Sequence, residues 1–394
     1  MNDSAGSPFD TNKCIADLRE RNVTPILAVY GHEEMLIDSR KVLLTRIIPA
    51  TVTCPFGILL NCLYLYVVVR VRSMHTLTNM YLSNQAVVDC MFLVLYCLQA
   101  VGEPISSDII HDKTYLGAAG CLLVNILLDV FLFVSEFNIV LVTFERYMAI
   151  CRPFTADRIS SKSRTRKLII LTWVVGLAFS TPMVYFYTDW TSVCVIWQGP
   201  ANATANLPLS YSNCWRHLTK VTEGVLFTFP PLIAFSLALT TIFVLNALTF
   251  RELRRGTKHY RPNTHDSKMR LFQQRQIVVM LAVTAAVFFF CLFPYHLDLL
   301  IAFLNSVPGR QPIVMPKSWQ ELVRWLPLVS ASTNPIIYGI LNKQCRNAFR
   351  SAMLCRSRLH SGRDHSTYRL TSTSTASRKG SDIYERAVND ITSK

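Results

Sequence analysis

Long apolar runs are the feature that most constrains the fold of this chain. A helix rises about 1.5 Å per residue, so about 20 apolar residues are needed to cross a hydrocarbon core roughly 30 Å thick. Such runs are so numerous that too little polar chain is left to cover them in a soluble protein. The sequence therefore predicts an all-α membrane protein, a bundle of seven transmembrane helices. The runs are 47–69, 80–101, 116–144, 168–187, 224–248, 277–304 and 322–341.

Lys and Arg are unevenly distributed over the segments that join these runs. The segments after the first, third and fifth runs hold 17 of them, whereas those after the second, fourth and sixth hold 5. The tail from residue 342 adds 11, and the tail before residue 43 has 5. Because Lys and Arg accumulate on cytoplasmic loops, the sequence predicts a plasma-membrane protein with an extracellular N-terminus and a cytoplasmic C-terminus. This bias explains the net charge of +15, so nucleic acid is not an expected partner.

Acceptor motifs for N-glycosylation agree with this topology. The pattern Asn-x-Ser/Thr occurs at Asn2, Asn22 and Asn202, all on the side that the charge distribution makes extracellular. The first ten residues, MNDSAGSPFD, have no basic start followed by an apolar stretch. We therefore expect no cleaved signal peptide and insertion by the first helix.

Four cysteines lie on the extracellular side of the predicted bundle, where disulfides form. Cys121 lies at the outer end of the third helix, and Cys194 and Cys214 lie in the long loop 188–223 before the fifth. Cys121 is expected to pair with Cys214, with Cys194 as the alternative, and Cys14 with the loop cysteine left over. A bond from Cys121 would hold the loop over the mouth of the bundle.

Ionisable side chains within the apolar runs indicate function, because charge is costly in lipid. They form no continuous acidic relay of the kind a pump needs. The chain also lacks the His-Glu-x-x-His and Gly-x-Ser-x-Gly patterns of hydrolases, so an enzyme is not expected. The second half shows no clear repeat of the first, which disfavours a transporter. The residues in question are Asp89, Asp129, Glu136, His296, Asp298 and Arg324.

Several short motifs occur in order along the seven runs. They are Asn61 in LLNCLYLYV, Asp89 in LSNQAVVD, Cys121 and Glu145-Arg146-Tyr147 at the two ends of the third run, Trp173, Pro230 or Pro231, Pro294 in FFFCLFPYH, and Asn334-Pro335-Ile336-Ile337-Tyr338. In these motifs, over about residues 43–355, the chain resembles the rhodopsin-like (class A) G-protein-coupled receptors.

The resemblance implies that the bundle switches between two packings. Arg146 would be held by Glu145 in the inactive state and would meet a heterotrimeric G protein in the active one. Tyr338 would swing inward to support the active state, while Pro294 and Pro335 would supply the kinks about which helices bend. The residues assigned to coupling and switching are Glu145, Arg146, Tyr147, Pro294, Asn334, Pro335 and Tyr338.

The same resemblance implies a polar site in the middle of the bundle. Asp89, with Ser135 and Asn334, would bind a sodium ion or ordered water. No other metal and no cofactor is expected.

Other positions depart from the family pattern. Leu292 stands where an aromatic toggle is expected, and Ala238 stands where a Tyr is usual. Ser330-Ala331 replaces an Asn-Ser pair, which can leave the sodium site incomplete. Glu136 occupies a position that is usually aliphatic and is expected to hydrogen-bond within the bundle.

Two side chains that are missing from the predicted helices disfavour particular classes of ligand. No lysine stands between 322 and 341, so retinal and light sensing are not expected. Leu128 stands where amine receptors carry Asp, and Asp129 is about 100° around the helix from it, which disfavours an amine.

The long loop 188–223, which could form a hairpin lid beside an open cavity, favours a peptide. YMAICRPF, CLFPYH and the short third inner loop are similar to receptors for small neuropeptides, including the thyrotropin-releasing-hormone and FMRFamide groups. The alternatives are a class A receptor for a lipid or amine, and a transporter.

Polar and aromatic residues near the outer ends of the helices are the candidates for ligand binding. Glu103 and Asp298 could pair with a basic group of the ligand, and Arg324 with a carbonyl or an acid. Alternatively, Glu103 and Arg324 bond each other or water. The full set is Glu103, Asp129, Tyr295, His296, Asp298 and Arg324.

The sequence divides into four parts: an extracellular tail (1–42), the receptor domain (43–342), an amphipathic eighth helix on the membrane surface (343–355) and a disordered cytoplasmic tail (356–394). Cys355 is a predicted palmitoylation site. The Ser/Thr run 371–375 is predicted to be phosphorylated by receptor kinases, and the phosphorylated run would recruit an arrestin. The alternative is that it is a low-complexity linker. The basic segments 158–167 and 251–275 can attract membrane lipids as well as a G protein.

Overall fold

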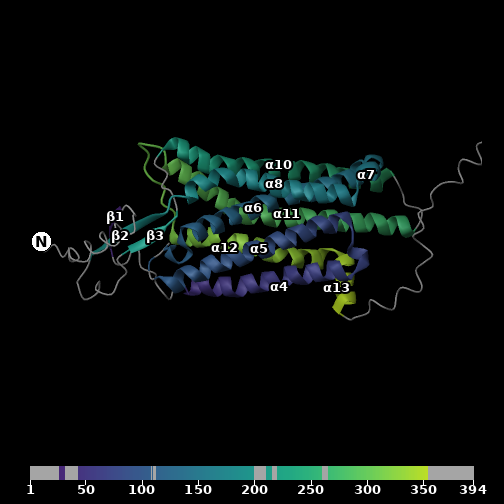
Figure 1. The fold of residues 1–394 in the computed structure, drawn as a ribbon. Helices are drawn as coiled ribbons and strands as arrows, with labels where there is room; N and C mark the ends of the chain where they lie inside the picture. The colour runs from purple at the N-terminus through teal and green to yellow at the C-terminus, as the bar shows by residue number, and fades with distance from the viewer. Residues whose placement is uncertain are drawn as a thin grey trace, which may run out of the picture. The chain divides into compact units, whose positions relative to one another are not determined.

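The computed structural model describes residues 26–31, 43–107, 109, 112–198, 210–214, 220–259 and 265–353. Each predicted run is the core of a long helix (Figure 1). The helices extend beyond the apolar runs because the runs mark only the hydrocarbon-spanning part, while the backbone hydrogen bonds continue into polar sequence. They are α4 (Ile48–Arg70), α5 (Leu77–Ser106), α6 (Gly117–Cys151), α8 (Lys162–Tyr187), α10 (Val221–His259), α11 (His265–Asn305) and α12 (Lys317–Leu341).

Two of the long helices begin at a capping hydroxyl: Thr76 accepts from the amide of Asn79 before α5, and Ser161 accepts from the amide of Arg164 before α8. Short elements join or follow the long helices. They are η1 (Leu43–Ile47), η2 (Arg72–Met74), η3 (Thr114–Leu116), α7 (Pro153–Ile159) and α13 (Lys343–Met353).

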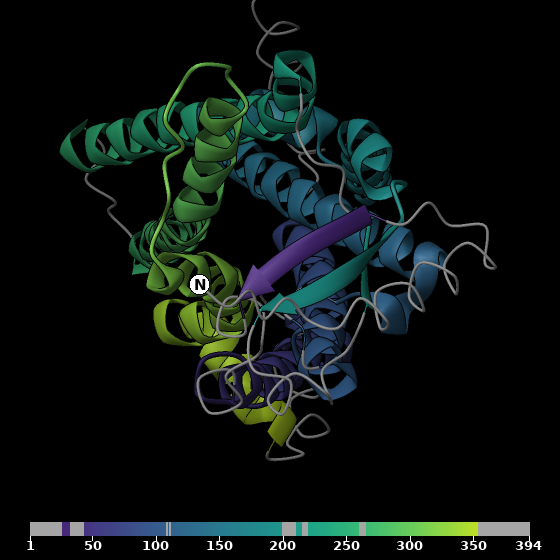
Figure 2. The same ribbon diagram turned by 90° about the vertical axis from the view of Figure 1, so that its left-hand side faces the viewer.

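The long helices form a closed ring. Neighbouring helices pack in the order α4, α5, α6, α10, α11, α12 and back to α4, and α8 packs against α6 from outside the ring. Figure 2 looks along the helices and shows this arrangement. A ring of this kind leaves an interior into which polar side chains can point away from lipid.

Helix α12 differs from its neighbours in composition. The other six are long and apolar enough to cross a membrane, whereas α12 carries buried polar residues such as Ser330, Ser332 and Asn334. Its 25 residues rise about 37 Å, and it packs between α4 and α11. Its role as a spanning helix therefore follows from its length and its place in the ring more than from its hydropathy.

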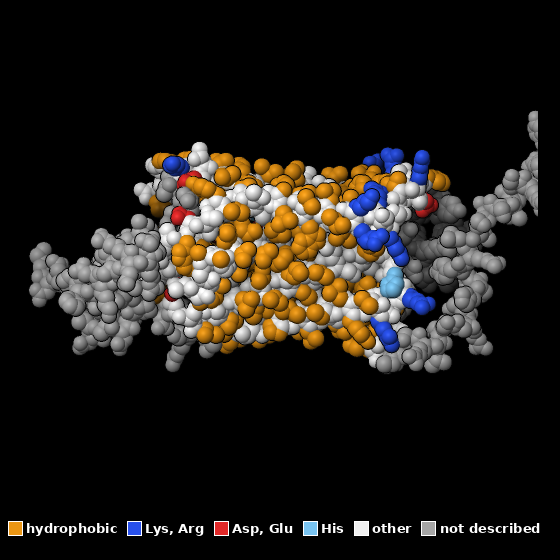
Figure 3. All heavy atoms as spheres, viewed as in Figure 1, with side chains coloured by type: hydrophobic (Ala, Val, Ile, Leu, Met, Phe, Trp, Pro, Cys, Tyr) orange, Lys and Arg blue, Asp and Glu red, His pale blue; other side chains and the backbone are white. Residues whose placement is uncertain are grey.

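Polar and apolar residues are distributed oppositely to those of a soluble protein. Phe243 and Phe290 are 73% and 76% exposed, whereas Asn61 and Glu136 are fully buried. Hydrophobic side chains cover the middle of the surface in Figure 3, and Lys and Arg gather at one end. We call this end, where α4 stops at Arg70 and α8 starts at Lys162, the basic end.

A small sheet marks the opposite end, which we call the sheet end (Figure 2). Its strands are β1 (Ile26–Gly31), β2 (Thr191–Gln198) and β3 (Ser210–Asn213), in the order β1-β2-β3. β1 runs parallel to β2, and β2 and β3 pair antiparallel, so the loop before α10 contains a hairpin. The fold thus adds a sheet to the predicted all-α bundle.

A disulfide ties this hairpin to the helices. Cys214, directly after β3, is bonded to Cys121 in the first turns of α6. Cys194 on β2 is also disulfide-bonded, which excludes the alternative in which it pairs with Cys121. Cys14 lies outside the described residues. The backbone amide of Lys113 donates to the carbonyl of Ser212 at 2.7 Å, which holds β3 against the start of α6 a second time.

Candidate functional site

Helices α5, α6, α11 and α12 surround a cavity of about 340 Å³, and α8 and α10 each add one aromatic residue to its wall. It lies toward the sheet end, because Asn125 on its wall also reaches Cys214, at 3.4 Å from amide nitrogen to sulfur. Most of the wall is apolar or aromatic. Its ionisable members include four of the six predicted ligand residues: Asp129, Tyr295, Asp298 and Arg324.

The three charged residues on the cavity wall each accept a hydrogen bond from a neighbouring side chain. The Tyr187 hydroxyl donates to Asp129 Oδ2 at 3.0 Å. The Trp319 indole donates to Asp298 Oδ1 at 3.0 Å, and the Tyr96 hydroxyl donates to the backbone carbonyl of Arg324 at 2.8 Å. A largely apolar cavity with a few fixed polar groups suits a ligand that has both apolar and polar parts.

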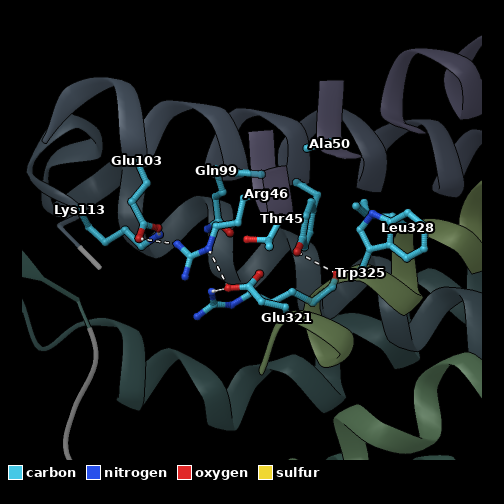
Figure 4. Close-up of a pocket in the computed structure, with 12 residues that line it drawn as sticks. Thr45, Arg46, Ala50, Gln99, Glu103, Lys113, Glu321, Trp325 and Leu328 are labelled. Atoms are coloured by element: carbon cyan, nitrogen blue, oxygen red, sulfur yellow. Dashed lines mark hydrogen bonds and ion pairs between the residues drawn. The ribbon is translucent and has the colours of Figure 1, made fainter. Parts of the chain in front are cut away.

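A second pocket, of about 160 Å³, adjoins the first between α4, α5 and α12. Tyr96 and Arg324 line both. Figure 4 shows charged side chains pointing toward one another across it. Besides Glu103 and Arg324, the pocket has three charged residues that were not predicted, because they stand outside the apolar runs and only the fold brings them together. They are Arg46, Lys113 and Glu321.

The charges in this pocket alternate in sign. Glu103 binds Lys113 at 2.8 Å and Arg46 at 3.4 Å, and Arg46 also contacts Glu321 at 3.3 Å. Arg324 binds Glu321 at 3.4 Å. The direct pairing of Glu103 with Arg324 that the sequence left open is therefore replaced by a network in which other residues stand between them.

His296 is not among the described residues that line the two pockets. It is buried, its Nδ1 donates to the carbonyl of Leu292 at 3.0 Å, and its ring stacks on Phe235 with centroids 3.9 Å apart. Its Nε2 faces the Glu136 carboxyl at 3.7 Å. Neither carboxyl oxygen of Glu136 has a hydrogen-bond partner among the described residues. The pair thus joins α6 to α11 through an apolar core.

Replacing His296 is expected to lower the free energy of unfolding more than replacing Glu136. His296→Phe keeps the stack on Phe235 but leaves the buried Glu136 carboxyl without the imidazole beside it, and a buried polar group left unsatisfied costs about 1–3 kcal/mol. Glu136→Leu leaves a neutral imidazole and costs roughly 1 kcal/mol. Thermal unfolding of the purified protein in detergent measures both.

The double variant is the control for this prediction. It removes both polar groups, so it should recover at least half of the stability lost in His296→Phe. Equal melting temperatures for the two single variants, with additive effects in the double variant, would contradict the pairing.

Asp89 lies in the middle of the ring among amides. Asn334 Nδ2 donates to its Oδ2 at 2.7 Å, and Gln85 Nε2 donates to its Oδ1 at 3.0 Å. Ser135, the third member of the predicted sodium site, is joined to Asp89 through Gln85, whose Nε2 lies 3.0 Å from the serine hydroxyl. Gln85 was not among the predicted residues, although it stands one helical turn before Asp89.

The order of the helices and these interior polar groups agree with one family of proteins. Residues 60–338 match the family described as 7 transmembrane receptor (rhodopsin family), which is more than two thirds of the chain. The chain belongs to this receptor family. Its members are receptors rather than enzymes, and coupling to a G protein is implied by membership.

Individual relatives of this receptor agree with the predicted resemblance. It is 26% identical over 382 residues to the thyrotropin-releasing hormone receptor of Gallus gallus, which covers 92% of each chain. The neuromedin-U receptor 1 of Rattus norvegicus is 29% identical over 341 residues, covering 81% of this chain and 76% of the relative. The substance-P receptor of Mus musculus is 27% identical over 307 residues, covering 75% and 67%. The resemblance to neuropeptide receptors is confirmed.

The residues predicted to couple to a G protein lie at the basic end. Arg146 donates to Glu145 Oε1 at 3.0 Å, and Tyr147 beside them is half-buried. Tyr338 is buried, with its ring centroid 5.4 Å from that of Tyr64. The Tyr338 hydroxyl has no hydrogen-bond partner among the described residues. Pro294 and Pro335 lie inside α11 and α12, respectively.

Proposed function

We propose that this receptor is activated by an extracellular peptide that enters the 340 Å³ cavity from the sheet end. The observation that carries the proposal is the combination of an apolar cavity with Asp129, Asp298 and Arg324 on its wall. An apolar side chain of the peptide would fill the cavity. A basic group would reach Asp129, and a backbone carbonyl or a carboxylate would reach Arg324. The similarity to the thyrotropin-releasing hormone receptor and to neuromedin-U receptor 1 supports this class of ligand.

The basic end is proposed to face the cytosol and to bind a heterotrimeric G protein. The excess of Lys and Arg at this end supports the orientation, since positive charge accumulates on the cytoplasmic side. The ion pair of Glu145 with Arg146 would be broken when the receptor is activated, which frees Arg146 for the G protein. In this orientation the sheet end is outside the cell, and the receptor resides in the plasma membrane.

The proposed topology also assigns the modification sites. Glycosylation at Asn2, Asn22 and Asn202, and palmitoylation at Cys355, concern residues outside the described part. Cys345, the neighbouring cysteine on α13, is a poor alternative for lipidation, since it is buried and burial raises the pKa of its thiol to about 12. Phosphorylation of 371–375 by receptor kinases and binding of an arrestin, together with attraction of membrane lipids to the basic segments, complete the proposal.

The proposal is tested by screening a library of short neuropeptides on cells that express the receptor, with calcium and cyclic AMP as readouts. Once a peptide activates, Asp129→Asn and Arg324→Gln should each raise its half-maximal concentration at least tenfold, because one hydrogen bond to a charged group is worth about 1.5–3 kcal/mol. Matched controls are Asp157→Asn and Arg310→Gln, which alter exposed residues that do not line the cavity and should leave the potency unchanged.

Other outcomes would overturn the proposal. Activation by a lipid or an amine, with no active peptide, would replace the ligand class while keeping the receptor. Uptake of a solute in cells without G-protein signalling would instead indicate a transporter.

A further inference from the structure

The residues around Asp89 form a continuous buried chain of hydrogen bonds between helices. Asn138 on α6 donates from Nδ2 to the carbonyl of Tyr81 at 3.0 Å and to Gln85 Oε1 at 3.0 Å. Gln85 Nε2 in turn donates to both Asp89 and Ser135 at 3.0 Å. Gln85, Asp89 and Asn138 are each at most 4% exposed. The chain therefore links α5 to α6 without reaching the surface.

The orientation of the Gln85 amide is fixed by this chain. A backbone carbonyl only accepts, so the atom of Asn138 that faces Tyr81 is its nitrogen. The same nitrogen faces the oxygen of Gln85, which turns the nitrogen of Gln85 toward the carboxylate. An ionised carboxylate also only accepts, so both ends of the chain require the same orientation.

The Gln85 nitrogen stands where a cation would have to bind. A sodium ion shared by Asp89 and Ser135 would lie between the Asp89 Oδ1 and the serine oxygen, and the Gln85 nitrogen already lies 3.0 Å from each of these two atoms. The other carboxylate oxygen accepts from Asn334 at 2.7 Å. Hard cations need oxygen ligands, yet here both carboxylate oxygens face N–H donors. The residues present do not fit a sodium ion.

We infer that the Gln85 side-chain amide takes the place of the sodium ion, so that this receptor has no sodium-dependent regulation at Asp89. The partial positive charge of the amide hydrogens stabilises the carboxylate in the place of the ion. The link from Asp89 to Ser135 is then a permanent part of the fold. Ala331, which presents a methyl group where a polar ligand is expected, removes a further ligand. The inference does not depend on the peptide or the G protein.

Thermal unfolding of the purified full-length receptor tests this inference. The melting temperature is measured in increasing NaCl, with choline chloride at the same concentration to correct for ionic strength. For the natural sequence we expect the same melting temperature in both salts. For Gln85→Leu, which frees the carboxylate and the serine oxygen, we expect a saturable sodium-specific rise of roughly 2 °C or more, since a ligand stabilises in proportion to RT ln(1 + [L]/Kd).

Controls separate the possible outcomes. Adding Asp89→Asn to Gln85→Leu should remove the sodium-specific rise, and Gln85→Met is the second variant if Gln85→Leu does not fold. A saturable sodium-specific rise in the natural sequence that Asp89→Asn abolishes would overturn the inference. Folded Gln85 variants that show no response to sodium would also overturn it, because some residue other than Gln85 would then exclude the ion.

Discussion

Replacing Arg146 with alanine is expected to lower nucleotide exchange on a purified heterotrimeric G protein by at least tenfold, down to the level of membranes without receptor. In the proposed mechanism the guanidinium leaves Glu145, to which it donates at 3.0 Å, and meets the G protein. Each hydrogen bond to a charged group is worth about 1.5–3 kcal/mol, and 1.4 kcal/mol is a factor of about ten. Exchange is measured without added ligand and again with any peptide that the library screen identifies.

The matched control is Arg70→Ala, which removes an exposed arginine at the same end of the bundle and should retain exchange. Binding of the activating peptide to Arg146→Ala should be mostly unchanged, since the cavity lies toward the other end. Exchange by Arg146→Ala at the level of the natural receptor would refute the assigned role. Loss of peptide binding together with exchange would indicate misfolding, and Arg146→Lys, which keeps the charge, would then distinguish the two explanations.

Removing the disulfide between Cys121 and Cys214 is expected to produce the largest loss of stability. The bond closes a loop with a sequence separation of 93 residues, and the loss of a native disulfide typically costs about 2–5 kcal/mol. For a protein of this size the melting temperature should fall by roughly 2–6 °C. Cys121→Ala, Cys214→Ala and the double variant should behave alike, because each removes the same single bond.

Binding of the activating peptide should be lost with this disulfide, because Cys214 holds the hairpin of β2 and β3 at the mouth of the cavity. Cys62→Ala is the matched control, since this cysteine is free and exposed and its loss should shift the melting temperature little. Additive losses in the two single variants would show that the thiols contribute separately. Normal peptide binding in all three variants would separate the hairpin from ligand recognition.

Hydropathy and charge were enough to predict the helices, because crossing a membrane imposes a length and a composition that can be read along the chain. The apolar runs 80–101 and 277–304 lie inside α5 and α11, although both helices continue several residues further. The seventh helix shows the limit of this approach. Its polar residues, such as Ser330 and Asn334, lower its mean hydropathy. They face the interior of the ring, and only the packing of the helices shows which side is exposed to lipid.

The candidate site was predicted in part. Asp129, Asp298 and Arg324 line one cavity, as expected of ionisable groups within spanning helices. Glu103 instead lines the adjoining pocket. There it forms an ion pair with Arg46, which lies in η1 just before α4. A partner 57 residues away leaves no periodic signal in the sequence, so such a pair cannot be found without the fold.

The sequence by itself determined the number and order of the helices and the family, because apolar length and local motifs are properties of neighbouring residues. Only the tertiary structure decided which polar groups meet in the interior. Gln85 illustrates the difference: in the sequence it is one polar residue in a helix, and in the fold its amide lies between Asp89 and Ser135. A low-dielectric interior makes each such contact strong, and its partners come from helices that are far apart in the chain.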